Sequence, residues 1–482
     1  MTYDVAIVGA GFSAIALTIN LLDILPPEAT IAVIGDDPGF GRGTAYRTEF
    51  YLHRLNVPAA RMSIFPDQPD DFTDWLTSRG KAVSPDTFAS RGDFGLYLRD
   101  RLASRLRARE HRARLDFVRA KAVSCNDGQG DGISFVLDTG GSLRARTVVL
   151  ALGVGSAGLP VASDRVSAAA RGRIIENPWT MGWLSHVGRN NAICVLGSGL
   201  TMIDQVLSLR ARGHRGQIRA LSRRGLVPIP HLDRRSEPVA VDLPDGAELS
   251  QVLHALRRSA DDVADWRSVI DGLRPKTQAL WQGLTMAQRS RFMRHALAWW
   301  NIHRHRIAPD VHRKFQALVA DGTVEVEAGF LSGIHDDGDG VRVEYRPRGS
   351  QNATTFIADL VVNCTGMEKA GIRHSPLLRT MCDLGLIRID ELGLGIVVDK
   401  TSRVLGDTQL QNAGLFAVGA LTAGQFWEIT AVPDIRVQAK RIAEAIPRSF
   451  TSPKDARRAE HNPTDLDGSF WRDTDSEADF IS

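Results

Sequence analysis

Cysteine is scarce in this chain, and no two cysteines stand close together. The cysteines, Cys125, Cys194, Cys364 and Cys382, are spread over 482 residues and form no C-x-x-C pair. Structural zinc sites and redox dithiols commonly use such pairs. The spacing therefore argues against a zinc site and against thiol–disulfide exchange.

Long apolar runs and an excess of one charge are also missing. No run approaches the roughly 18 apolar residues of a membrane span, and no basic segment precedes the first apolar stretch. Lysine and arginine number 59 against 56 aspartates and glutamates, a net charge of +3, whereas nucleic-acid-binding proteins usually carry a stronger basic excess. We expect a cytoplasmic protein that acts on a small molecule, with no membrane or nucleic-acid partner. The oligomeric state is left open.

The N-terminal stretch YDVAIVGAGFSAIALTIN has the pattern of a strand, a glycine turn and a helix. Residues 5–8 are apolar, as in a strand buried on both faces, and Gly9, Gly11 and Ala14 then form G-x-G-x-x-A. In this fingerprint the first glycine permits the tight turn, the second lets a pyrophosphate approach the backbone, and the small third residue lets helix pack on strand. The alternative is an ordinary strand–helix turn, because one fingerprint alone is weak.

A second strand follows at the spacing of a βαβ unit. Residues 29–35 are mostly apolar and are followed by Asp36 and Asp37. A carboxylate after this strand commonly binds the adenosine ribose. Gly35 stands directly after the apolar run, so which of the two aspartates reaches the ribose is open.

Residues 191–213 repeat the plan of strand, glycine turn and helix. Gly197 and Gly199 supply the first two glycines, and Met202 stands where the small third residue is usual. This departure places the helix farther from the strand. The repetition predicts a second nucleotide site.

The strand that follows the second turn predicts the choice of nicotinamide coenzyme. It spans residues 217–225 and ends in Ser222, Arg223 and Arg224, with no acid. Arginines and a hydroxyl match a ribose 2′-phosphate, whereas an acid would favour the free 2′-hydroxyl. We therefore expect NADPH in preference to NADH; the alternative is a pair of surface arginines on a solvated loop.

Three further stretches fit a two-nucleotide protein. Residues 147–153 and 360–366 are buried-strand patterns that end in glycine, as expected where the chain crosses between two domains. Residues 413–446 predict a strand, a glycine-rich loop and a helix with Pro433 near its first turn, where proline is tolerated. The positive end of that helix could lie under a reduced flavin. Phe426 and Trp427 lie beside the flavin or in the core, the core being expected for at least one.

The most specific segment covers residues 39–76. It contains an N-x-P-x-x-x-M-x-x-F-P-D run made by Asn56, Pro58, Met62, Phe65, Pro66 and Asp67. To about residue 446, the chain resembles a bacterial family of FAD/NAD(P)-binding proteins that includes a FAD-dependent urate hydroxylase, and more distantly the class B flavin monooxygenases. The resemblance implies that Asn56 lies beside the reactive edge of the isoalloxazine. The alternative for Asn56 is a turn-capping side chain.

The resemblance also implies the fold and its division. We expect an α/β protein with two Rossmann-like dinucleotide-binding domains of the three-layer ββα, glutathione-reductase-like type. The FAD-binding domain would cover residues 1–187 and 367–446, and the NAD(P)H-binding domain residues 188–366, with a helical insertion at about 248–319. Residues 447–482 are expected to form a polar tail.

The activity implied is that of an NAD(P)H- and O₂-dependent flavoprotein monooxygenase. It would hydroxylate a small nitrogen-containing substrate, a purine such as urate or an amine, through a flavin C4a-hydroperoxide, with Asn56 as the catalytic residue. Two alternatives stay open: an NAD(P)H–flavin oxidoreductase or dehydrogenase without oxygen insertion, and a flavin-binding regulatory protein without turnover.

The expected cofactor contacts come from both fingerprints and from the flavin-facing stretches. They are Gly9, Gly11, Phe12, Ser13, Ala14, Asp36, Asp37, Arg42, Gly43, Asn56, Met62, Gly153, Gly197, Gly199, Leu200, Thr201, Ser222, Arg223, Arg224, Gly366, Gly419, Phe426, Trp427 and Pro433. No metal is expected: His295, His303 and His305 lack a nearby carboxylate or cysteine in the sequence, and the i and i+2 spacing divides two of them between different sides of a helix. A basic, tryptophan-flanked helix face is the better interpretation.

Overall fold

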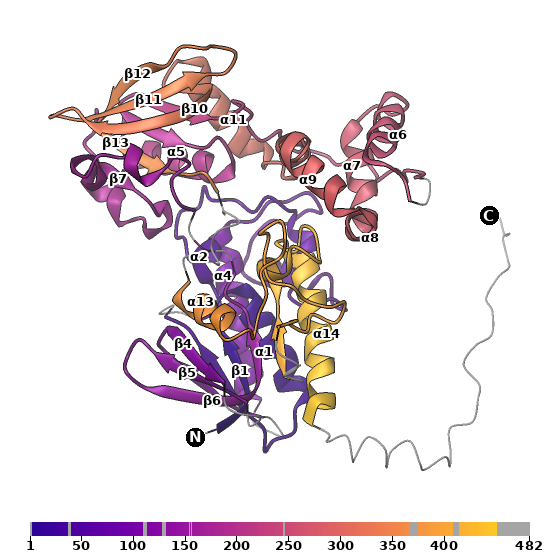
Figure 1. Cartoon of the computed structure of the whole chain (residues 1–482). Coiled ribbons are helices and arrows are strands. Elements are labelled where there is room, and N and C mark those ends of the chain that lie inside the picture. Colours follow the sequence, from indigo (N-terminus) through magenta and orange to yellow (C-terminus); the bar gives the residue numbers. More distant parts are fainter. Residues whose placement is uncertain are drawn as a thin grey trace, which may run out of the picture.

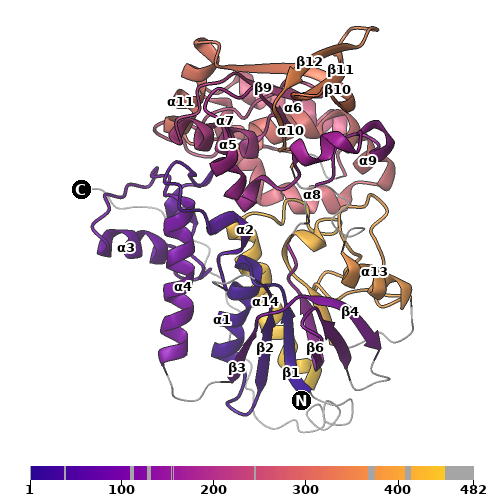
Figure 2. The ribbon, with the colours of Figure 1, turned by 90° about the vertical axis from the view of Figure 1, so that its left-hand side faces the viewer.

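The computed structural model describes residues 2–36, 40–108, 113–127, 132–153, 155, 157–243, 246–366, 375–407 and 414–450. These residues form two seven-stranded sheets, each with helices packed on it (Figures 1 and 2). The predicted α/β fold class with parallel sheets is confirmed.

The first sheet has the order β3-β2-β1-β6-β5-β4, with β14 paired to β6. Its strands are β1 (Thr2–Val8), β2 (Thr30–Ile34), β3 (Arg114–Val118), β4 (Ala122–Asp127), β5 (Ile133–Leu137), β6 (Ser142–Leu150) and β14 (Leu415–Ala417). β3, β2, β1, β6 and β14 pair in parallel, whereas β4, β5 and the start of β6 pair antiparallel. Val5, Ala6 and Ile7 of β1 have no exposed surface, as the apolar run predicts for a strand covered on both faces.

Helices from both ends of the chain cover this sheet. α1 (Phe12–Ile24) and α14 (Val432–Phe450) pack against each other, and α1 also contacts α4 (Arg91–Arg107). The remaining short helices of this part are α2 (Gly43–Tyr46), η1 (Ala59–Arg61), α3 (Asp71–Ser78), α13 (Pro376–Asp383) and η7 (Gly419–Thr422). α14 brings the C-terminal part of the chain beside the N-terminal fingerprint helix (Figure 1).

The second sheet has the order β12-β11-β10-β9-β8-β13-β7. Its strands are β7 (Ile174–Ile175), β8 (Ile193–Leu196), β9 (Ile218–Ser222), β10 (Val324–Asp336), β11 (Val341–Pro347), β12 (Thr354–Ala358) and β13 (Leu360–Asn363). Residues 174–175, expected in the FAD-binding domain, pair as β7 with β13 of this sheet. Hydrogen-bonded pairing thus starts the second sheet before residue 188.

Helices cover the second sheet and extend from it. α5 (Leu200–Ala211) follows β8, and α11 (Pro309–Ala320) precedes β10. Between β9 and α11 lie α6 (Leu249–Asp261), α7 (Trp266–Leu273), η6 (Arg274–Lys276), α8 (Thr277–Gly283), α9 (Met286–His295) and α10 (Leu297–Arg304). α6 to α9 stand to one side of the sheet, with α8 toward α14 (Figure 1). The connection from β6 to β8 contains η2 (Ser163–Arg165), η3 (Ala169–Arg173), η4 (Pro178–Thr180) and η5 (Gly182–His186).

The C-terminal boundary differs from the sequence expectation. Residues 447–450, expected in the tail, continue α14, which includes Pro447. The rest of the expected tail, 451–482, lies outside the described residues. In the part of the chain that the structure describes, no helix combines the length and the apolarity needed to cross a bilayer.

Candidate functional site

The first glycine turn leaves bare backbone at the start of α1. Gly9 has φ 129°, and a Cβ there would lie 2.2 Å from the carbonyl oxygen of Ala151. At Gly11, the N-terminal cap of α1, the nearest atom to a Cβ would be Cα of Gly43, at 3.9 Å. Glycine at 9 is therefore required by the fold, whereas Gly11 and Gly43 face each other as bare backbone, and a Cβ on Gly43 would lie 3.0 Å from Cα of Gly11. Such a turn fits the pyrophosphate of a dinucleotide.

The next residues of α1 are buried and join this turn to the C-terminal loop. Phe12, Ser13 and Ala14 are buried, and Ala14 has no exposed surface. A Cβ on Gly419, which has φ 76°, would lie 2.7 Å from Oγ of Ser13. The backbone N–H of Gly419 donates to Oε1 of Gln438 at 2.8 Å. The start of η7 thus lies directly on the fingerprint helix.

The expected ribose-binding position is only partly described. Asp36 follows β2 and forms an ion pair with Lys121 at 3.0 Å, with both side chains 62% exposed. Asp37 lies outside the described residues. Arg42, the N-terminal cap of α2, has a buried Nε without a partner among the described residues.

The second glycine turn has the same construction as the first. Gly197 has φ 101°, and a Cβ there would lie 2.4 Å from the carbonyl oxygen of Cys364. Gly199 caps α5, with no atom within 4 Å of a Cβ placed on it. In both turns the first glycine abuts the carbonyl that follows a parallel neighbour strand, β6 or β13. Met202 has no exposed surface and packs in the core of the second sheet, while Leu200 and Thr201 are half-buried.

Both strands that end in glycine lie beside a fingerprint strand. β6 pairs with β1, and β13 with β8. Gly153 and Gly366, which follow them, have φ 67° and 86° with nothing within 4 Å of an added Cβ. The chain bends there in a conformation that favours glycine.

The end of β9 presents two arginines. Oγ of Ser222 accepts from Oγ of Ser198 at 2.7 Å and from the backbone N–H of Gly225 at 3.0 Å, so its hydroxyl already shapes the loop. Arg223 is exposed and Arg224 half-buried. Neither has an ion-pair partner among the described residues.

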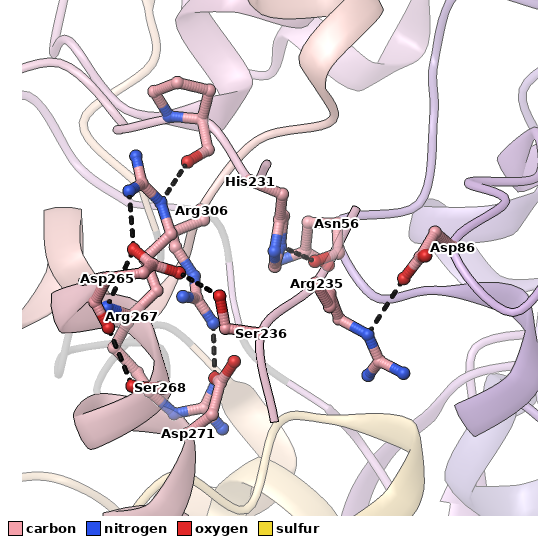
Figure 3. A network of polar contacts seen from close by, with 12 residues as sticks. Asn56, Asp86, His231, Arg235, Ser236, Asp265, Arg267, Ser268, Asp271 and Arg306 are labelled. Carbon is pink, nitrogen blue, oxygen red and sulfur yellow. Dashed lines mark hydrogen bonds and ion pairs between the residues drawn. The ribbon is translucent and has the colours of Figure 1, made fainter. Parts of the chain in front are cut away.

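Asn56 lies beside a histidine that sequence reasoning missed. Its backbone carbonyl accepts from Nε2 of His231 at 3.1 Å (Figure 3). Burial, and then the charge of Arg306, lower the pKa of His231 to about 4, so the imidazole is neutral near pH 7 and Nε2 carries the proton. The Asn56 side chain is half-buried and makes no hydrogen bond to a described residue, which leaves the turn-capping interpretation without support. Met62 is buried.

Phe426 and Trp427, expected beside the flavin or in the core, differ in their surroundings. Trp427 is 9% exposed and stacks on Trp281 of α8 with 4.3 Å between ring centroids. Phe292 meets the same ring edge-on at 5.6 Å. Trp427 is therefore a core residue that anchors α8, while Phe426 is half-buried between the two cores of the first sheet. Pro433 is the second residue of α14, a position that tolerates proline.

The histidines that invited a metal interpretation have other contacts. Nδ1 of His303 lies 2.8 Å from the carbonyl of Trp299, and Nε2 of His305 lies 3.6 Å from Glu428. His295 is exposed at the end of α9. In the described ranges no group of three or more His, Cys, Asp or Glu side chains could hold a metal ion.

A buried polar bridge connects the part of the chain around the first sheet to α5. Arg91 of α4 forms an ion pair with Asp204 at 2.8 Å, with side chains 14% and 7% exposed. His53, fully buried, contacts Oγ of Ser208 at 2.8 Å. Burial raises the pKa of Asp204, against the opposing charges of Arg91 and His53, and lowers that of His53.

Two surface hollows lie away from Asn56. The larger, about 480 Å³, lies between α4 and the end of β3, with Phe40, Leu106 and Phe117 in its wall. The smaller, about 220 Å³, lies at the end of α5. Neither is lined by Asn56 or His231.

These features define an α/β protein with two dinucleotide-type glycine turns, one on each sheet. Residues 6–155 match a family model described as FAD-NAD(P)-binding. The N-terminal part is accordingly a FAD-NAD(P)-binding domain. No curated protein matches the chain.

Solved structures with a similar fold include an ornithine N-hydroxylase, an L-lysine 6-monooxygenase and a thioredoxin reductase. The ornithine N-hydroxylase of Kutzneria sp. 744 is 16% identical, with 94% of this chain and 100% of that chain covered and a TM-score of 0.63. The L-lysine 6-monooxygenase of Pseudomonas syringae is 18% identical, with 93% and 100% covered and a TM-score of 0.62. The thioredoxin reductase of T. acidophilum is 13% identical, with 93% and 99% covered and a TM-score of 0.51. At these identities the likeness shows the fold.

Proposed function

We propose that this protein is a FAD-dependent monooxygenase that uses NADPH and O₂ to hydroxylate a small nitrogen-containing substrate. The observation that carries the proposal is the pair of equivalent glycine turns, Gly9–Gly11 on the first sheet and Gly197–Gly199 on the second. Two such turns serve a protein that binds two dinucleotides. The similar fold of solved ornithine and lysine hydroxylases supports oxygenation of an amine nitrogen; urate or another purine is the other candidate.

The residues of the first turn fit FAD. Gly11 and Gly43 present backbone without side chains at the N-terminus of α1, whose N–H groups favour an anion. Bound there, FAD would supply the hydride and oxygen chemistry that amino-acid side chains lack. The Gly197–Gly199 turn would hold the pyrophosphate of NADPH, and Arg223 with Arg224 its 2′-phosphate.

Asn56 is the residue that we assign to the chemistry. The side-chain amide of Asn56 has no hydrogen-bond partner among the described residues. Its backbone carbonyl accepts a hydrogen bond from the neutral imidazole of His231. A free amide on a fixed backbone can donate one hydrogen bond to a reacting oxygen without prior rearrangement. Its task would be to hold that oxygen and to limit its loss as H₂O₂.

A thiol-dependent reduction, which the fold of thioredoxin reductase could suggest, does not suit these cysteines. Cys125, Cys194 and Cys364 are buried and Cys382 is half-buried, and within the described residues none of the four forms a disulfide. Burial raises the pKa of Cys194 to about 12, which disfavours the thiolate that such chemistry needs.

The test combines a substrate screen with one variant. Wild-type protein should consume NADPH and yield a product heavier by one oxygen atom, as mass spectrometry would show. The Asn56→Ala variant should keep FAD and consume NADPH, but release H₂O₂ in place of product, with roughly ten- to hundredfold less hydroxylation, because one strong hydrogen bond is lost. NADPH oxidation without any oxygenated product in the wild type would contradict the monooxygenase; full coupling in the variant would contradict the role of Asn56.

A further inference from the structure

Four arginines from separate segments gather next to the Asn56 loop. We call Arg61, Arg235, Arg274 and Arg304 the arginine cluster. Arg61 ends η1, Arg235 lies in the loop after β9, Arg274 begins η6 and Arg304 ends α10. Nη1 of Arg436 in α14 donates to the carbonyl of Ser63, and Asp434 of the same helix pairs with Arg274, so the loop of Arg61 and Arg274 meet at the start of α14. Burial, and then the charges of the three other arginines, lower the pKa of Arg61, against the opposing charge of Asp271. Like charges in a partly buried place are costly unless anions balance them.

Three members of the cluster already have a carboxylate partner. These pairs, with their N–O distances, are Arg235–Asp86 (3.1 Å), Arg274–Asp434 (3.2 Å) and Arg304–Glu428 (3.1 Å). The partners come from segments that pack around the cluster, including α14 and the loop before it. The ion pairs therefore hold these guanidinium groups in fixed positions.

Arg61 is the member without such a partner. It is half-buried and makes no side-chain hydrogen bond or ion pair with any described residue. Asp271, the acid whose charge acts on it, is already bound by the buried Arg306. In addition, Nη1 of Arg235 is buried and has no partner among the described residues. Two guanidinium groups thus keep unused donors.

These unused donors lie close to the residue that we assign to the chemistry. Arg61 follows Asn56 in the same loop, and Figure 3 shows Arg235 beside Asn56 and His231. His231, bound to the carbonyl of Asn56, feels the charge of Arg235. A group bound by Arg61 and Arg235 would therefore be presented to Asn56.

We propose that the arginine cluster receives a carboxylate of the substrate, so that the molecule presented to Asn56 is a small organic anion. The assignment of the arginine cluster to the substrate rests on the proposed function. Guanidinium groups bind carboxylates through two parallel hydrogen bonds. Coenzyme phosphates are assigned to other segments, at the Gly197–Gly199 turn and at Arg223 and Arg224. The cluster favours an amine that also carries a carboxylate and disfavours a cationic diamine.

The experiment measures binding without turnover. Succinate, glutarate and malonate would be titrated calorimetrically into the purified flavin-loaded protein without NADPH. We expect at least one to bind, the Arg61→Ala variant to bind it at least tenfold more weakly, and Arg61→Lys to retain part of the affinity. The control is Arg294→Ala, an exposed arginine of α9, which should bind like the wild type. Neutral succinamide and cationic putrescine should not bind.

Each other result would overturn the proposal. It fails if none of the three dicarboxylates binds the wild type, or if Arg61→Ala and Arg294→Ala bind alike. It also fails if NADP⁺ competes with the dicarboxylate and Arg61→Ala weakens the binding of NADP⁺. The arginine cluster would then bind a phosphate of the coenzyme. If circular dichroism shows that Arg61→Ala does not fold, Arg235→Gln, which removes the second unused donor, takes its place. That variant must then bind the dicarboxylate at least tenfold more weakly than the wild type. Dicarboxylate binding without any oxygenated product would instead contradict the proposed function alone.

Discussion

Gly9 and Gly11 lie two positions apart, yet a side chain would act differently at each. At Gly9 the backbone has φ 129° and a Cβ would collide with Ala151, so the requirement for glycine belongs to the fold. At Gly11 a Cβ meets no described atom closer than 3.9 Å. The requirement there comes from whatever approaches the turn.

The two positions give a matched pair of variants. We expect Gly11→Val to fold with nearly the unfolding temperature of the flavin-free wild type but to purify colourless or weakly loaded with FAD. Gly9→Ala should instead lower the free energy of unfolding by at least roughly 1–3 kcal/mol, because the backbone conformation is strained for a residue with a Cβ and that Cβ would also collide with the carbonyl oxygen of Ala151. Thermal unfolding of flavin-free proteins and the FAD content after purification measure both effects. Full FAD occupancy in Gly11→Val would refute the assignment of this turn.

How far sequence predicts such residues depends on where their neighbours lie in the chain. Gly9 and Gly197 were predictable, since a strand, turn and helix are contiguous and the positive φ at both positions needs glycine locally. His231 and Arg61 were not, because their importance comes from Asn56, Arg235, Arg274 and Arg304, which only folding brings near. Trp427 shows the same limit, since its partner Trp281 lies in a distant helix.

In β9 and the loop after it, one residue shapes the loop while its two neighbours stay without ion-pair partners among the described residues. Oγ of Ser222 holds the loop through Ser198 and Gly225, and Arg223 and Arg224 are left without ion-pair partners in the described ranges. In the proposed function, this division leaves the two arginines for the 2′-phosphate of NADPH. The hydroxyl of Ser222, expected to contact the phosphate, instead accepts hydrogen bonds within the loop.

The coenzyme preference should depend on those two arginines. We expect the KM for NADPH to be lower than that for NADH by a factor on the order of ten or more, since one charged pair contributes about 1.5–3 kcal/mol. Arg223→Ala combined with Arg224→Ala should remove most of this difference. Steady-state kinetics with both coenzymes measure it, with Ser222→Ala as a comparison that should perturb the loop without removing charge. A wild-type preference for NADH would contradict the assignment.

The two sheets and their helices are held together by polar contacts as well as by packing. The Arg91–Asp204 ion pair and the contact of His53 with Ser208 are buried where α5 meets the first part of the chain. Two charges removed from water need each other, because a lone buried charge is far more costly than a pair. The bridge therefore holds α5, the helix that follows the second glycine turn, against α4 and the loop of His53.

Breaking this bridge on one side should be costly. We expect Arg91→Ala to reduce the free energy of unfolding by about 3–5 kcal/mol, whereas replacing both partners, by Arg91→Met with Asp204→Leu, should cost less. Arg313→Ala removes an ion pair whose side chains are 63% and 76% exposed, and should change stability by less than about 1 kcal/mol. Urea denaturation of the four proteins compares them. Equal stability of Arg91→Ala and Arg313→Ala would show that the buried pair adds nothing.

The chain passes between its two sheets twice, once after β6 and once after β13, because β14 and α14 return to the first sheet. The two halves are consequently tethered at two points, and a protease that cuts one connection leaves the other in place. Such a nicked protein would run as two fragments on a denaturing gel while eluting as one particle from a sizing column. Exchange of the second sheet between relatives by recombination would likewise need two junctions, one in each connection.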